Sequence, residues 1–120
     1  MVIHSSEARN GVVIIKLSGR LVFDESLFTL RPKIKGLLES GVKAIIFDLG
    51  EVSYCDSSGL GEMIGAYTTI RKHDAAIAFV KLTPKVRTLW ERINITNVFD
   101  IFETVVEAET FLATDPSPQG

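Results

Sequence analysis

The amino-acid sequence predicts one α/β domain, in which a mostly parallel central sheet starts with an N-terminal β-hairpin and carries about four helices. Its 120 residues suit a single compact unit. With 46% hydrophobic and 23% charged residues, the composition is ordinary for a globular protein. Strand-like and helix-like segments follow one another in the order ββαβαβαβα, which gives parallel strands joined by helical crossovers.

The first two strands are predicted at residues 2–3 and 12–17, where β-branched residues dominate. Asn10 and Gly11 between them form a strong hairpin turn signal. Gly19 is expected to end the second strand.

The first helix is predicted between residues 26 and 39, where apolar residues recur every three or four positions: Leu27, Leu30, Ile34, Leu37 and Leu38. Pro32 interrupts this pattern, because its ring would clash with the carbonyl of Phe28 in a continuous helix. We therefore expect either a kink or a regular helix that begins near Arg31. Gly41 is predicted to cap the C-terminus.

A continuous apolar run at residues 44–49 is typical of a central strand covered on both faces. A short loop and a second long helix are expected next, with a core-facing stripe made of Leu60, Met63, Ile64, Tyr67 and Ile70. Residues 77–80 form the following predicted strand.

Thr83 and Pro84 predict the start of a third helix, with Thr83 as the N-cap. The buried face of this helix should comprise Val86, Leu89, Trp90 and Ile93. A fifth strand is expected at residues 98–102.

Residues 104–107 match a capping box, which predicts a last short helix that carries Phe111 and Leu112 to the core. Residues 115–120 contain two prolines and no apolar residue, so we expect a frayed tail. The folded domain should therefore span residues 1–114.

Charge and composition exclude several partners and locations. The chain has 13 Lys and Arg against 15 Asp and Glu, and its net charge of -2 offers no cationic field to nucleic acid. No apolar run approaches the ~20 residues that cross a bilayer, and no secretory signal is visible. The single cysteine, Cys55, fits a reducing compartment. We expect a cytoplasmic protein without membrane insertion.

The strongest candidate site is the serine turn, defined as Asp56, Ser57, Ser58, Gly59, Leu60 and Gly61. It lies at the predicted start of a helix, where free amides and the helix dipole favour an anion. One interpretation is structural, with Ser57 or Ser58 as a helix N-cap. That role does not explain Gly59 and Gly61, each of which costs about 0.8 to 1 kcal/mol of helix propensity relative to Ala. The other interpretation is an exposed turn that is modified or binds a ligand.

Enzymatic interpretations of the serine turn fail on spacing. A nucleophile elbow needs a glycine two residues before the serine, and neither serine has one. His73 would lie about 24 Å from Ser57 along one helix, too far for a general base, and His4 has no supporting partner in the sequence. The glycines are one residue too widely spaced for a dinucleotide fingerprint, and two histidines with one cysteine make no metal cluster. The sequence predicts no catalytic residue, metal or cofactor.

Five segments carry a resemblance to a known family. They are Gly-Arg-Leu at residues 19–21, Phe-Asp-Leu at residues 47–49, the serine turn, and residues 84–87 together with residues 98–99. With these segments, the chain from about residue 12 to residue 112 resembles the STAS domain family, and within it the bacterial anti-sigma factor antagonists.

The resemblance implies a protein-binding switch that is not itself an enzyme. Such an antagonist, when unmodified, binds an anti-sigma factor that is also a serine kinase, and thereby frees a sigma factor. The kinase phosphorylates the first residue after the aspartate, which here is Ser57, with Ser58 as the alternative. A phosphoserine phosphatase resets the switch.

The implied partner surface comprises the serine turn and Asp24. Many antagonists carry an acid directly after the Gly-x-Leu of the second strand, whereas here Val22 holds that position and the acid follows at Asp24. Two alternatives stay open: a non-catalytic STAS subunit of a larger stress-signalling scaffold or transport complex, and a small-molecule binder that uses the glycine turn.

Overall fold

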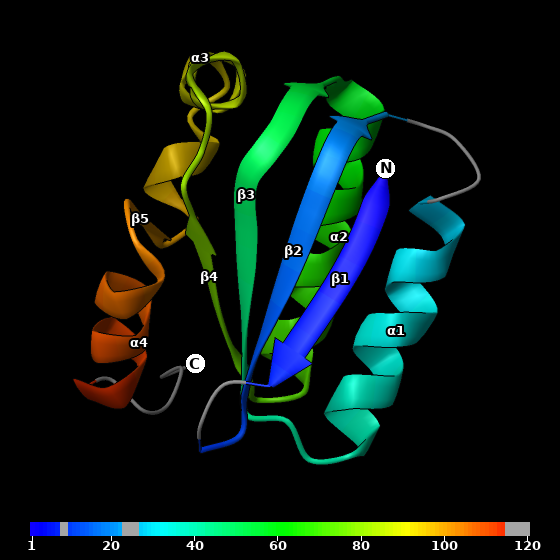
Figure 1. Ribbon diagram of the computed structural model, residues 1–120, viewed down its shortest axis with the longest axis vertical. Coiled ribbons are helices and arrows are strands. Elements are labelled where there is room, and N and C mark those ends of the chain that lie inside the picture. The colour runs from blue at the N-terminus through cyan, green and yellow to red at the C-terminus, as the bar shows by residue number, and fades with distance from the viewer. Residues whose placement is uncertain (8–9, 23–26, 115–120) are drawn as a thin grey trace.

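The computed structural model describes residues 1–7, 10–22 and 27–114. Five strands form one sheet in the order β1-β2-β3-β4-β5 (Figure 1), and these are β1 (Val2–Glu7), β2 (Val12–Leu21), β3 (Ala44–Cys55), β4 (Ala76–Val80) and β5 (Ile101–Phe102). The helices are α1 (Leu27–Glu39), α2 (Ser57–Lys72), α3 (Pro84–Arg92) and α4 (Val105–Thr114), with a 3-10 turn at Ile95–Asn97. Among the strands of the described residues, only β1 is antiparallel to its neighbour. The predicted class and order of elements are confirmed.

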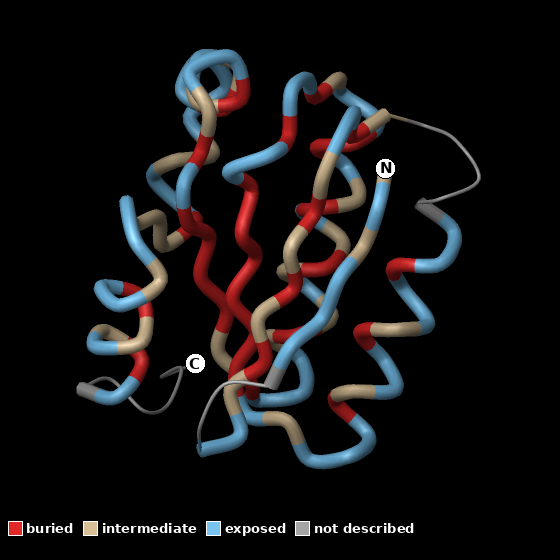
Figure 2. Tube along the Cα trace, in the orientation of Figure 1, coloured by how far each residue is buried: buried red, intermediate tan, exposed pale blue. Residues whose placement is uncertain are grey.

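Helices cover both faces of the sheet (Figure 1). Buried residues of α1, α2 and α3 join those of β2, β3 and β4 in the larger core, while α4 packs on the opposite face in a smaller one. The centre of the sheet is accordingly the most continuously buried part of the chain (Figure 2). Trp90 is fully buried, as predicted, and its ring meets that of Phe79 edge-on at 5.3 Å.

The hairpin turn signal is confirmed, since Asn10 and Gly11 both adopt positive φ values of 60° and 79°. The prediction that Gly19 ends the second strand is wrong, because β2 continues to Leu21. Gly19 has a φ of +99° and lies at a shift in the pairing with β3. It therefore marks a bulge, for which glycine is well suited.

The predicted loop after residue 49 is absent, because β3 runs on to Cys55. Its register with β2 shifts twice, and each shift adds one residue on the β3 side. These bulges break the alternation of inward and outward residues, so the buried Val52 and Cys55 are three positions apart. The sequence pattern of a strand ends at the first bulge although the strand does not.

Helix α1 begins at Leu27 and contains Pro32, so the alternative of a helix that begins near Arg31 is wrong. Buried residues lie on both sides of the proline, namely Leu30, Ile34 and Leu38. Their packing holds the helix together where the proline removes one backbone hydrogen bond. Gly41, at a φ of +96°, caps the C-terminus as predicted.

Helix α3 has Thr83 at its N-cap position and Pro84 at its first turn, as predicted. The Thr83 hydroxyl does not cap the helix but donates to the carbonyl of Val52 at 2.9 Å, which ties α3 to β3. The prediction that Ile93 lies in the core is wrong: this residue is 46% exposed, because α3 ends at Arg92.

The fifth strand is shorter than predicted, since only Ile101 and Phe102 pair with β4. The capping box of α4 is confirmed in both directions. The amide of Glu107 donates to Thr104 Oγ1, and the amide of Thr104 donates to Glu107 Oε1, both at 3.1 Å. Leu112 is buried and Phe111 half-buried against the sheet.

Candidate functional site

The serine turn follows the carboxyl end of β3 without a loop. Asp56 has an extended backbone and is the N-cap of α2, where its Oδ1 accepts the amide of Gly59 at 2.8 Å. Ser57 and Ser58 are the first two residues of the helix. The interpretation of either serine as the N-cap is therefore wrong, because the preceding carboxylate has that role and also opposes the positive end of the helix dipole.

Both serine side chains are exposed. Neither hydroxyl forms a hydrogen bond with any residue that the structure describes. The start of α2 is thus stabilised by Asp56, and the two hydroxyls face solvent with no structural partner in that part of the chain.

Gly59 is explained by packing within the molecule. A Cβ at this position would lie 1.9 Å from the carbonyl oxygen of Leu21, the last residue of β2. The amide of Asp56 donates to the same oxygen at 3.3 Å. Glycine therefore allows the serine turn to dock directly on the end of β2.

Gly61 has no such explanation. It is exposed, and a Cβ built on it meets nothing within 4 Å. One turn further along the helix, Ile64 is 38% exposed. The helix surface after the serines thus lacks a side chain at Gly61 although the fold leaves room for one.

The predicted partner residues divide between surface and core. Ser57, Ser58 and Gly61 are exposed and Asp56 is half-buried. Gly59 and Leu60 are buried, with Leu60 only 5% exposed. Asp24 lies outside the described residues.

The Asp56 carboxylate limits the predicted affinity of the helix amides for an anion. The amide of Gly59 is already occupied by the Asp56 carboxylate. A free anion at this helix start would also meet that negative charge at short range. The turn is consequently a poor pocket for a diffusible phosphate.

Cys55 precedes the turn, is 7% exposed, and donates from Sγ to the carbonyl of Asp56 at 3.4 Å. Burial raises the pKa of the Cys55 thiol to about 11, and the nearby Asp56 carboxylate acts in the same direction. The thiol is protonated at neutral pH and is a weak nucleophile.

The histidines do not approach the serines within the fold. His73 lies at the opposite end of α2, where its Nδ1 is 3.0 Å from the carbonyl of Thr69. His4 pairs with Lys16 on the edge of the sheet. Across residues 1–7, 10–22 and 27–114, no three potential ligands gather into a metal site.

No helix in the described part of the chain has the length and apolar character needed to cross a membrane.

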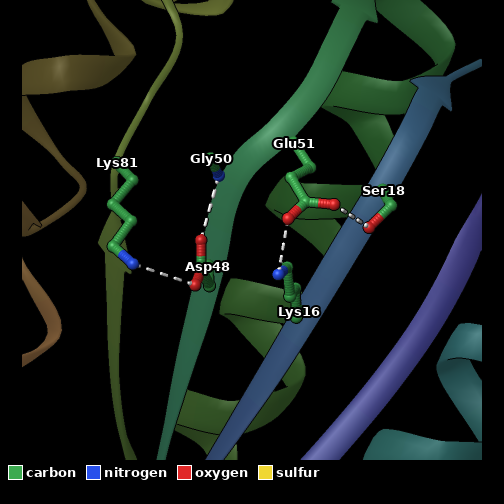
Figure 3. Close-up of polar contacts among 6 residues, drawn as sticks. All are labelled: Lys16, Ser18, Asp48, Gly50, Glu51 and Lys81. Atoms are coloured by element: carbon green, nitrogen blue, oxygen red, sulfur yellow. Dashed lines mark hydrogen bonds and ion pairs between the residues drawn. The ribbon is translucent and has the colours of Figure 1, made fainter.

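Sequence reasoning missed a polar cluster on the sheet (Figure 3). Lys16 Nζ lies 2.6 Å from Glu51 Oε2, and Ser18 donates to the other oxygen of Glu51 at 3.4 Å. The hydrogen bond and charge of Lys16 lower the pKa of Glu51.

Asp48, which lies on β3 like Glu51 and is only 8% exposed, accepts the amide of Gly50 at 3.0 Å and lies 3.6 Å from Lys81 Nζ. These groups neutralise one another, and their arrangement is structural. The pairing register that creates it is set by the β3 bulge, which sequence periodicity does not reveal.

Comparison with known proteins gives a consistent result. The STAS domain family matches residues 5–108. The anti-sigma F factor antagonist of Paenibacillus polymyxa is 27% identical over 106 residues, which cover 88% of this chain and 91% of that protein. The anti-sigma-B factor antagonist of Listeria monocytogenes is 36% identical over 77 residues, 60% of this chain and 64% of the relative.

Among solved structures, the anti-sigma factor antagonist SpoIIAA in its unphosphorylated form superposes with a TM-score of 0.80. The match covers 94% of this chain and 97% of that one at 21% identity, and therefore supports the fold. The family match extends over most of the sequence, and the sheet order and helix placement agree with it. The chain belongs to the STAS domain family.

Proposed function

We propose that this protein is an anti-sigma factor antagonist controlled by phosphorylation of Ser57. When unphosphorylated, it binds an anti-sigma factor that is also a serine kinase and thereby frees a sigma factor. The observation that carries the proposal is the exposed serine pair at the start of α2, whose hydroxyls have no structural partner among the described residues. The names of the curated relatives support the same role.

The choice of Ser57 over Ser58 rests on family resemblance, because the modified serine directly follows the aspartate. Both side chains are equally open to a kinase, since both are exposed at the first turn. Ser58 is the alternative acceptor.

Phosphorylation acts through charge at the binding surface. A phosphate adds about -1.5 to -2 charges, against a net charge of -2 for the whole chain. It would stand beside the Asp56 carboxylate, and the amide of Gly59 is already in use. The phosphate therefore remains on the surface, where its charge and bulk oppose binding of the partner. A loss of only ~2.8 kcal/mol at the interface weakens binding about a hundredfold.

The chemistry of this cycle is carried out by the partners. The kinase transfers the phosphate and a phosphoserine phosphatase removes it, while this domain supplies the hydroxyl and the docking surface. The proposed setting is the cytoplasm.

The test uses anti-sigma factor kinases produced from the source organism. Each is incubated with the protein and ATP, and intact mass followed by peptide mapping locates the phosphate. We expect one phosphate on Ser57, none on Ser57→Ala, and normal phosphorylation of Ser58→Ala. In calorimetry, Ser57→Ala should bind the kinase and Ser57→Asp should bind at least tenfold more weakly.

Equal binding by Ser57→Ala and Ser57→Asp would contradict the switch. A phosphate mapped to Ser58 would move the site by one residue. A chain that ignores every kinase and elutes from a sizing column as a large self-assembly would favour the scaffold alternative.

A further inference from the structure

A groove of about 490 Å³ lies beside the serine turn, between the end of β3 and helix α3. Tyr54 and Cys55 line it from β3, and Lys85, Thr88, Leu89 and Arg92 line it from α3. The hydrogen bond from the Thr83 hydroxyl to the Val52 carbonyl links the start of α3 to β3. The two walls therefore belong to elements that are held together by the fold.

The groove is lined by both apolar surface and positively charged side chains. Tyr54 is 42% exposed and Leu89 is half-buried, so both offer apolar surface to a bound protein segment. Lys85 and Arg92 are exposed and form no ion pair with a carboxylate of the described residues. None of the described residues that line the groove is acidic.

Two other cations lie near the groove, and both have a partner within the protein. The guanidinium of Arg20 lies 5.1 Å from the centre of the Tyr54 ring, at the same end of the sheet. Arg87, on the same helix as Lys85, is already paired with Glu103 at 3.7 Å. In a chain with a net charge of -2, a groove with two cations that have no ion-pair partner among the described residues is a local reversal of sign.

We propose that this groove binds an acidic segment of the partner protein, with an apolar side chain seated on Tyr54 and Leu89 and carboxylates facing Lys85 and Arg92. Charge complementarity selects that occupant, because a basic or neutral segment would leave both cations uncompensated. The inference rests on the proposed function in one respect, since it takes the anti-sigma factor as the source of the segment.

A segment bound in the groove would form a second contact with the partner, besides the one at the serine turn, and the phosphate on Ser57 would weaken this contact as well. Tyr54 lies three residues before Ser57, so a segment in the groove approaches the modified serine. A dianion on Ser57 would repel the same carboxylates that Lys85 and Arg92 attract. A single phosphate on Ser57 would then weaken the contact at the serine turn and the contact in the groove.

The direct test needs no kinase. A short synthetic peptide of Glu, Asp and Leu is titrated into the isotope-labelled full chain, and amide shifts are followed by NMR. A peptide with Lys in place of every acid is the control. We expect the acidic peptide alone to shift the amides of Thr88 and Leu89, with an affinity that falls as salt is added.

Two matched double variants distinguish the charge of the groove from the net charge of the chain. Lys85→Glu with Arg92→Glu should weaken peptide binding roughly tenfold or more, since two exposed charge contacts are reversed. Lys33→Glu with Lys35→Glu on α1 changes net charge equally, lies outside the groove and should bind as the parent does. Circular dichroism verifies that each variant is folded.

Four outcomes would overturn the inference: no shift at Thr88 and Leu89, equal binding of the lysine peptide, equal binding by the two double variants, or shifts caused by the protein's own concentration. The last would indicate a second copy of the chain in the groove. Because the peptide assay involves neither ATP nor a kinase, its failure leaves the Ser57 switch intact. Failure of the phosphorylation assay likewise leaves the groove result standing.

Discussion

The two glycines of the serine turn should respond in opposite directions to substitution by alanine. Both lie near the start of α2, and in a helix alanine is favoured over glycine by about 0.8 to 1 kcal/mol. At Gly61 nothing lies within 4 Å of the added Cβ. Gly61→Ala should therefore stabilise the domain by up to about 1 kcal/mol.

At Gly59 the added Cβ would lie 1.9 Å from the carbonyl oxygen of Leu21 and 2.7 Å from its carbonyl carbon. These are backbone atoms, so the start of α2 or the end of β2 must move. Overpacking of this kind costs typically 1–3 kcal/mol. Subtraction of the helix-propensity gain leaves a destabilisation of roughly 0 to 2 kcal/mol for Gly59→Ala, and we expect the upper half of that range because the atoms in the way belong to the backbone.

The assay is thermal and urea unfolding followed by circular dichroism. For a domain of this size, 1 kcal/mol corresponds to roughly 3–6 °C in Tm. Gly59→Ala should lower the Tm by several degrees and Gly61→Ala should raise it. If both variants shift the Tm in the same direction, the account of Gly59 as a packing requirement is refuted.

Three further predictions concern single groups. Asp56→Ala should lower the free energy of unfolding by about 1 kcal/mol, measured with urea, because the N-cap is lost. Asp56→Asn should keep most of the stabilisation by the N-cap, and equal losses in the two variants would contradict the capping role. The pKa of Cys55 is raised from 9.0 to about 11, so its stabilising contribution is complete below pH 9 and is lost as the pH rises through 11. Cys55→Ala should accordingly lose less stability than the parent over that interval, and parallel pH profiles would argue against a buried thiol. The lowered pKa of Glu51 should return towards its ordinary value in Lys16→Ala, as measured by NMR titration of the carboxylate; an unchanged titration would show that Lys16 is not the cause.

Local signals predicted much of the fold because their physics is local. The turn at Asn10 and Gly11, the cap at Gly41 and the box at residues 104–107 depend on a few neighbouring residues, and each is confirmed. The errors have a different origin. The true ends of β2 and β3 depend on pairing between strands, which a bulge shifts without a mark in the hydrophobic pattern.

The candidate site shows the same division. Its location at a helix start was predictable from the serine turn alone, but the roles within it were not. Asp56 rather than a serine is the N-cap. Position 59 must be glycine because the carbonyl of Leu21, on a strand far away in the sequence, leaves no room for a Cβ. The cations at the α3 groove become notable only when the fold places that helix beside Tyr54.

Because Asp56, and not a serine, is the N-cap of α2, Ser57 can be exchanged with little cost to the helix, and this makes the site open to chemical labelling. Ser57→Cys would introduce an exposed thiol, while the native thiol of Cys55 stays buried and protonated at neutral pH. A maleimide fluorophore should then attach at one position only. Its emission would report directly, in solution and in real time, on any protein that arrives at this end of the sheet.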